Sequence, residues 1–200
     1  MKPTINFCLI ILSLFLFFSC TVRKSLYKEG SNYVKYEYDK KDKYLTISGH
    51  VKLPEIRDKG DHSFLHVDFK YMPDLYGEVV RMNFFSATKG RCYKRNKTVK
   101  LYVDDQPVIY EGDLTYAAEW VVHKSFETEH TNQWGENLQV GLSKKELKQL
   151  ANCDKLSIGY LGNMTQEDIP FNFDGANVLA IKKFYEAVNK YDEYYALYNE

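Results

Sequence analysis

Residues 44–53 read Tyr-Leu-Thr-Ile-Ser-Gly-His-Val-Lys-Leu, and residues 62–71 read His-Ser-Phe-Leu-His-Val-Asp-Phe-Lys-Tyr. Every second position is apolar or glycine from Leu45 to Leu53, and every second position is apolar from Leu65 to Tyr71. Side chains on a β-strand alternate between the two faces of its sheet. Each stretch therefore predicts a strand with one face against a core and one polar face.

Similar segments recur along the chain between turns rich in Pro, Gly and Asp, so that about nine strands are predicted in total. Segment 124–137, which contains Trp134, lacks this pattern and is predicted to be a polar loop. The seven further predicted strands are 33–38, 78–87, 98–103, 108–110, 114–123, 138–142 and 156–161.

Two helices are predicted near the C-terminal end of the chain. Ser143-Lys-Lys-Glu146 has the capping-box pattern, so a short helix should occupy residues 143–151. Asp174 is a good N-cap for a long helix over 174–198, in which Phe184 lies on the apolar side. The predicted class is α+β: a mainly antiparallel β-sandwich or open barrel with these two helices packed against it.

The first nineteen residues have the layout of a signal peptide. Lys2 is their only charged residue, and an apolar run from Phe7 to Phe18 follows it. As a helix this run would be roughly 18 Å long, whereas the hydrocarbon core of a bilayer is about 30 Å thick. A permanent transmembrane helix is therefore the weaker interpretation.

The stretch Leu16-Phe-Phe-Ser-Cys20 resembles the lipobox of bacterial lipoproteins, in a relaxed form because Phe17 and Phe18 are bulky. The resemblance implies that Cys20 becomes the first mature residue and carries diacylglycerol on its sulfur. Such acyl chains would hold the protein on a bilayer through Cys20. An ordinary signal peptide followed by a chance cysteine is the alternative.

These features predict three parts: a signal peptide (1–19), the lipidated cysteine with a polar tether (20–32), and a single soluble β-rich domain (33–200). The protein is expected to be exported and lipid-anchored to a bacterial membrane, on either its periplasmic or its cell-surface face. The 27 basic and 27 acidic residues cancel, which disfavours a nucleic-acid partner.

Cys8 would leave with the signal peptide and Cys20 would be lipidated, so only Cys92 and Cys153 remain in the exported domain. Export to an oxidising compartment favours a disulfide between these two residues. The chain has no Cys and His spacing typical of a zinc site, and no cofactor is predicted.

The function predicted first is a non-catalytic binding or structural module with a protein or glycan partner. Two features of the sequence are candidates for the contact. Trp134 is a candidate exposed aromatic residue beside Gly135. The segment 89–97 carries five cations, which could bind an anionic partner: Lys89, Arg91, Lys94, Arg95 and Lys97.

The alternative function is an envelope hydrolase with an acid/base or metal site in the segment from His123 to His130. Two imidazoles and two carboxylates lie there within eight residues, from His123, Glu127, Glu129 and His130. No nucleophile elbow, phosphate-binding loop or His-Glu-x-x-His motif is present. A catalytic group assembled from distant residues would leave no such motif.

Overall fold

The computed structural model describes residues 21–58, 61–89, 98–122, 131–161 and 168–199. They form two antiparallel sheets and several helices, which confirms the predicted α+β class. The helices are α2 (Pro73–Tyr76), α3 (Lys144–Ala151), α4 (Gly175–Asn189) and α5 (Tyr191–Asn199).

The larger sheet has eight strands, seven of them in the order β1-β2-β3-β5-β6-β10-β9, while β4 pairs with β5. β1 and β9 are its edges in the described part of the chain, so this sheet is open. Its strands are β1 (Thr21–Glu29), β2 (Asn32–Asp39), β3 (Tyr44–Lys52), β4 (Ile56–Asp58), β5 (Asp61–Tyr71), β6 (Val80–Lys89), β9 (Asp113–Val122) and β10 (Thr131–Leu142).

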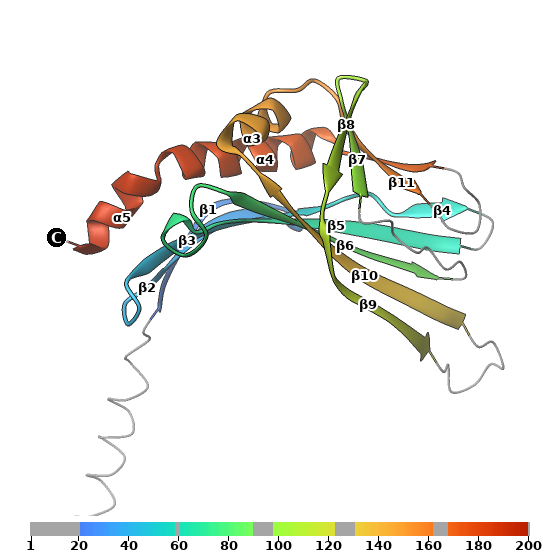
Figure 1. Cartoon of the computed structure of the whole chain (residues 1–200), viewed down its shortest axis with the longest axis horizontal. Helices are drawn as coiled ribbons and strands as arrows, with labels where there is room; N and C mark the ends of the chain where they lie inside the picture. The colour runs from blue at the N-terminus through green and yellow to red at the C-terminus, as the bar shows by residue number, and fades with distance from the viewer. Residues whose placement is uncertain (1–20, 59–60, 90–97, 123–130, 162–167, 200) are drawn as a thin grey trace, which may run out of the picture.

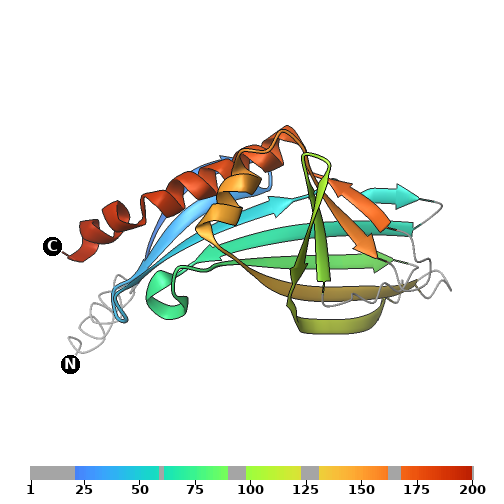
Figure 2. The same ribbon diagram turned by 45° about the horizontal axis from the view of Figure 1, so that its top comes forward.

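The smaller sheet has the order β12-β11-β7-β8. It lies on the same side of the larger sheet as α3 and α4, as both ribbon views show (Figures 1 and 2). The core is formed between these two layers, because the alternate apolar positions of the larger sheet face them. The strands of the smaller sheet are β7 (Thr98–Val103), β8 (Gln106–Glu111), β11 (Leu156–Leu161) and β12 (Asp168–Asn172).

Both predicted helix starts are confirmed by their caps. The Ser143 hydroxyl accepts from the backbone N–H of Glu146 at 3.2 Å, and the Glu146 carboxylate accepts from that of Ser143 at 2.7 Å. Asp174 caps α4 in the same way through Asn177. The Asn177 amide also donates to Lys52 O at 3.0 Å, so this cap ties the helix to the end of β3.

The long C-terminal helix predicted over 174–198 is two helices, with the break at Lys190. The break lets α5 follow the twisted surface of β2 and β3, where its tyrosines make ring contacts. Tyr194 stacks on Tyr36 at 5.0 Å between ring centroids, and Tyr198 stacks on Tyr38 at 4.7 Å.

Two predictions about loops are corrected by strand pairing. The segment predicted as a tether over 20–32 is folded from Thr21 onward, because β1 pairs with β2 from Thr21 opposite Asp39 to Glu29 opposite Asn32. The segment predicted as a loop over 124–137 is a strand from Thr131 onward, because β10 pairs with both β6 and β9. In each case a neighbouring strand supplies the backbone hydrogen bonds, and the sequence of the segment itself does not predict this pairing.

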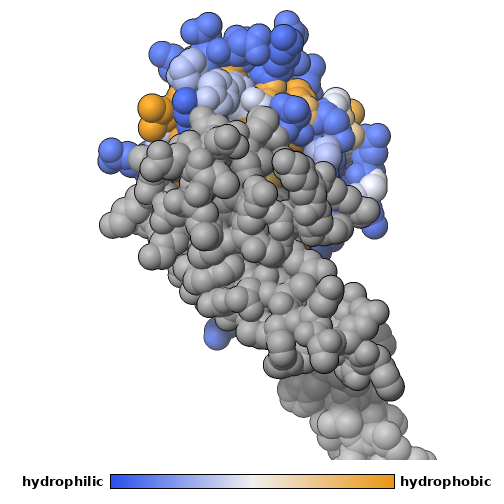
Figure 3. Space-filling model, turned by 90° about the vertical axis from the view of Figure 1, so that its right-hand side faces the viewer, coloured by the Kyte–Doolittle hydropathy of each residue, from blue (hydrophilic) through white to orange (hydrophobic). Residues whose placement is uncertain are grey.

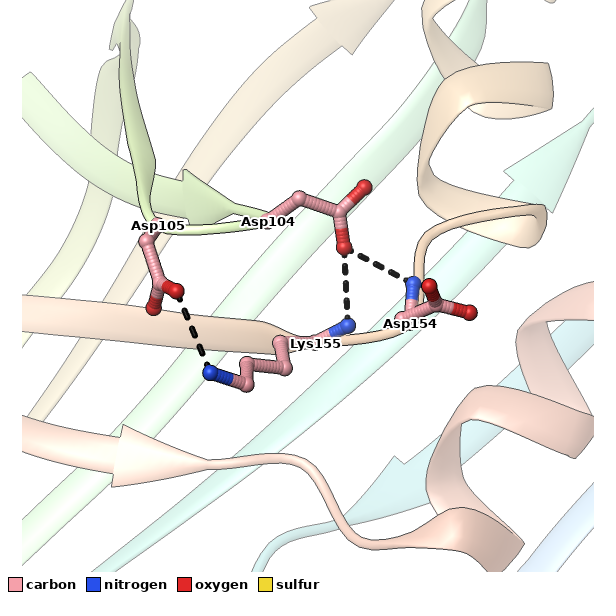
Figure 4. Close-up of polar contacts among 4 residues, drawn as sticks. All are labelled: Asp104, Asp105, Asp154 and Lys155. Carbon is pink, nitrogen blue, oxygen red and sulfur yellow. Dashed lines mark hydrogen bonds and ion pairs between the residues drawn. The ribbon is translucent and has the colours of Figure 1, made fainter.

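The turn between β7 and β8 joins the smaller sheet to the segment that follows α3 (Figure 4). Asp104 and Asp105 both have positive φ, at 49° and 64°, as in the tight turns that close hairpins. The Asp104 carboxylate accepts from the backbone N–H groups of Asp154 at 2.8 Å and Lys155 at 2.9 Å. The Lys155 ammonium pairs with Asp105 at 3.1 Å, so one turn holds two elements together.

Candidate functional site

The face of the larger sheet opposite the helices is polar and forms a groove of about 440 Å³. The groove crosses strands β1, β2, β3, β5 and β6, which supply the residues that alternate with the buried core positions. The polar residues that line it include Thr21, Arg23, Lys35, Glu37, Asp39, Thr46, Ser48, Asp68, Lys70 and Asn83.

The positive and negative charges of the side chains that line this groove cancel. Arg23 Nε lies 2.6 Å from Glu37 Oε1, and Lys35 Nζ lies 3.2 Å from the same oxygen, so one carboxylate on β2 holds two cations. Thr46 is opposite Glu37 in the strand register and is only 5% exposed. Three basic and three acidic side chains line the groove altogether, so it presents both donors and acceptors without a strong net field.

A histidine–aspartate pair lies beside the groove. His50 on β3 faces Asp68 on β5 in the strand register, and its Nδ1–H donates to the Asp68 carboxylate at 2.6 Å. The Tyr33 ring stacks on the His50 ring with 5.2 Å between centroids. The contacts from both sides fix the orientation of the His50 ring and leave its side chain only 17% exposed.

His66 extends this cluster along β5. Its ring meets that of His50 edge to face at 5.2 Å, and the Phe64 and Phe85 rings lie against it. Burial lowers the pKa of His66, and the nearby His50 and Lys52 lower it further. His66 is therefore held in its neutral form, as one member of an aromatic cluster at one end of the groove.

The His50–Asp68 pair has part of the geometry of a hydrolytic site. A histidine oriented by a carboxylate is two thirds of a hydrolytic triad, and Ser48 lies two residues before His50 on the same face of β3. No hydrogen bond joins Ser48 to His50 among the contacts of the described residues. Within that part of the chain, no group of three or more His, Cys, Asp or Glu residues could hold a metal ion.

The sites predicted from sequence fall mostly outside the described residues. This is true of Cys20, of Arg91, Cys92, Lys94, Arg95 and Lys97, and of His123, Glu127, Glu129 and His130. Lys89 is the last residue of β6. Trp134 lies within β10, opposite Thr88 on β6 and Glu119 on β9, so its position is in a paired strand and the predicted polar loop is corrected.

Cys153 is a buried thiol, and Cys92, its predicted disulfide partner, lies outside the described residues. The Cys153 Sγ–H donates to Leu150 O at 3.2 Å, just after the end of α3. Burial raises the pKa of this thiol, and the nearby Asp104 carboxylate raises it further, so the sulfur stays protonated and unreactive.

The groove itself was missed by the sequence analysis, which used the apolar positions of each strand to define a core. Arg23 was predicted to lie in the tether, and the alternation in β3 and β5 predicted a polar face without showing which of its side chains meet. A signal was present in the clustering of His50, His66 and Asp68 on the polar faces of two strands, but their pairing needs the strand register.

No protein-family model matches this chain, and no match was found among curated proteins or solved structures. Among the residues that the structure describes, no helix is both long enough and apolar enough to cross a membrane.

Proposed function

We propose that this chain is a membrane-anchored cell-envelope lipoprotein whose domain is a non-catalytic binding module. The resemblance of residues 16–20 to a lipobox supports the anchor at Cys20 and the bacterial envelope as its location. The observation that carries the binding role is the groove, which presents paired charges and hydroxyls on five strands of a rigid sheet. Rigid strands hold polar groups in place at little entropic cost when a ligand binds.

The chemistry of the groove favours a polar ligand without strong net charge, of which a glycan chain is the best example. Arg23 and Lys35 are both already paired with Glu37, so a charged ligand would have to break one of these ion pairs to bind them. The Tyr33 ring lines the groove, stacks on His50 and has Lys35 Nζ 5.5 Å from its centroid, and its edge can contact a sugar ring. Hydroxyl groups can bond both to the carboxylates and to the ammonium groups that remain accessible.

The binding role is tested by titrating the full chain with soluble glycan strands released from bacterial cell walls. Asp68→Asn and Lys70→Ala are each expected to weaken binding by about tenfold to a hundredfold, because a charged hydrogen bond contributes about 1.5–3 kcal/mol. Lys145→Ala is the matched control, since Lys145 is exposed on α3 and away from the groove. Equal affinities for all three variants and the parent chain would exclude the groove as the glycan site.

The anchor is tested separately with Cys20→Ser in a bacterial host. The parent chain should partition into the detergent phase, and the variant into the aqueous phase, because the run Phe7–Phe18 is too short to span a bilayer. Retention of the processed variant in the detergent phase would contradict anchoring through the Cys20 sulfur.

An envelope hydrolase is the second candidate, and the pairing of His50 with Asp68 is the observation that favours it. The segment His123–His130, which the sequence suggested for this role, lies outside the described residues. The same glycan strands discriminate between the candidates, since a hydrolase would release new reducing ends and would lose that activity in His50→Ala. A binding module would release none.

A further inference from the structure

The first residue after the proposed anchor is already part of the sheet. Thr21 begins β1 and is paired with Asp39, while Cys20 precedes it by one peptide unit, or about 3.8 Å between Cα atoms. If Cys20 is lipidated, no tether separates the bilayer from the folded domain. The end of the domain that contains Thr21 must then lie at the membrane surface.

Three other elements share that end of the molecule. The turn Lys40–Lys43 follows Asp39, and Tyr195 of α5 donates its hydroxyl to Lys43 O at 3.2 Å. Tyr191, which begins α5, donates to the Asp74 carboxylate at 2.8 Å and so joins α5 to α2. We call the turn 40–43, the segment 73–79 and helix α5 the proximal end; it lies on the left in Figures 1 and 2.

Among the side chains that the structure describes, most of the exposed large apolar ones lie at the proximal end. Six large apolar residues are exposed among those whose side chains the structure describes, and four of the six lie there: Leu75 (53%), Tyr76 (42%), Val79 (42%) and Leu197 (65%). The described surface at the opposite end is mostly hydrophilic, with smaller apolar areas (Figure 3). Exposed apolar patches on a protein surface mark contacts with other proteins or with membranes.

The proximal end carries charged side chains of both signs. Lys40, Lys41 and Lys43 are exposed, and a lysine side chain can extend from an apolar contact to the lipid headgroups. Asp42, Asp74, Glu78, Asp192 and Glu193 are exposed as well, so acidic side chains outnumber these lysines five to three. The contact should therefore depend more on the apolar side chains than on salt.

We propose that the proximal end rests directly on a phospholipid bilayer, with Leu75, Tyr76, Val79 and Leu197 inserted among the headgroups. This inference rests on the proposed lipid anchor at Cys20. Because no tether separates the anchor from the sheet, the anchor holds these apolar groups against the membrane at all times. This favours the bilayer over a protein as the partner of the proximal end.

The orientation has a consequence for the groove. Thr21 and Arg23 line it, so the groove opens close to the headgroups, and a ligand bound there would lie near the membrane surface. By contrast, β5 begins and β6 ends at the end of the sheet opposite Thr21. The eleven residues of β5 span about 35 Å, so these strand ends lie away from the bilayer.

Hydrogen exchange of the lipidated full chain tests the orientation. The protein is reconstituted on vesicles of phosphatidylethanolamine with a minor share of phosphatidylglycerol, and its exchange is compared with that of soluble Cys20→Ser. Exchange in residues 40–43, 73–79 and 191–199 is expected to slow on vesicles, and that of β7 and β8 to stay unchanged. The double variant Leu75→Asp and Leu197→Asp should lose this slowing but remain on the vesicles through its anchor.

Ile109→Asp is the matched control, because Ile109 on β8 is exposed to the same 65% as Leu197 but lies outside the proximal end. It should keep the full slowing. Unchanged exchange in the proximal end of the vesicle-bound chain would overturn the orientation and leave the anchor standing. Failure of the parent chain to bind vesicles better than Cys20→Ser would refute the anchor and, with it, this inference.

Discussion

Replacing Phe184 by alanine is expected to lower the free energy of unfolding by about 3–5 kcal/mol, the usual cost of removing a buried phenylalanine ring. Phe184 on α4 is fully buried, and its ring packs 5.4 Å from that of Phe69 on β5. For a domain of this size each kcal/mol corresponds to about 2–4 °C in Tm, so the midpoint should fall by about 6–20 °C. Leu179→Ala on the same helix, where Leu179 is 39% exposed, is the control with a much smaller expected effect.

A second substitution, at Gly49, tests whether the loss of stability in Phe184→Ala comes from the packing of this ring on β3. A Cβ built on Gly49 would lie 2.9 Å from Phe184 Cδ2, so α4 approaches β3 this closely only because position 49 has no side chain. Gly49→Ala alone should cost about 1–3 kcal/mol through overpacking. In the Phe184→Ala background the same methyl group enters the vacated space and should cost little or stabilise the protein.

Urea unfolding followed by circular dichroism measures all four members of this cycle. A coupling free energy of about 1 kcal/mol or more is expected between the two sites, because they are in direct contact. Additive effects of the two substitutions would refute the contact. A loss below about 1 kcal/mol in Phe184→Ala would show that α4 does not pack on β3 through this ring.

Three further predictions concern single residues. Ser143→Ala should cost about 1 kcal/mol in urea unfolding because the cap of α3 is lost, whereas Ser143→Asp should behave like the parent chain. Because the pKa of His66 is lowered in the folded protein, the unfolded chain binds a proton on this histidine more tightly. The free energy of unfolding should therefore fall as the pH drops below about 6.5. In His66→Gln the free energy of unfolding should change less between pH 7 and about pH 5. In Cys92→Ser, Cys153 should react with Ellman's reagent only after denaturant is added, and rapid labelling of the native protein would show that the thiol is not buried.

Features that depend on neighbouring residues alone were predicted from the sequence. The strands β3 and β5 follow from the alternation at Leu45–Leu53 and Leu65–Tyr71, since one buried face requires a period of two. The starts of α3 and α4 follow from Ser143 and Asp174, because a cap acts within three residues. These local signals were enough to establish the α+β class.

Features that depend on a distant partner were decided by the tertiary structure. β1 lacks a strong alternating pattern and is a strand because β2 offers its edge, and Thr131–Asn137 extends β10 because β6 and β9 lie on both sides. The chain breaks at Lys190 so that the tyrosines of α5 can reach Tyr36 and Tyr38. Backbone pairing and ring contacts of this kind join residues far apart in the chain, and no local pattern encodes them.

The candidate site belongs to this second group. His50 and Asp68 are eighteen positions apart, and Arg23 and Glu37 fourteen; each pair forms only when two strands are aligned in one register. A shift of one residue would turn the groove residues into the core, which burial of the opposite face forbids. The apolar alternation thus determined which residues would be polar and exposed, while the pairing of the strands decided which of them would meet.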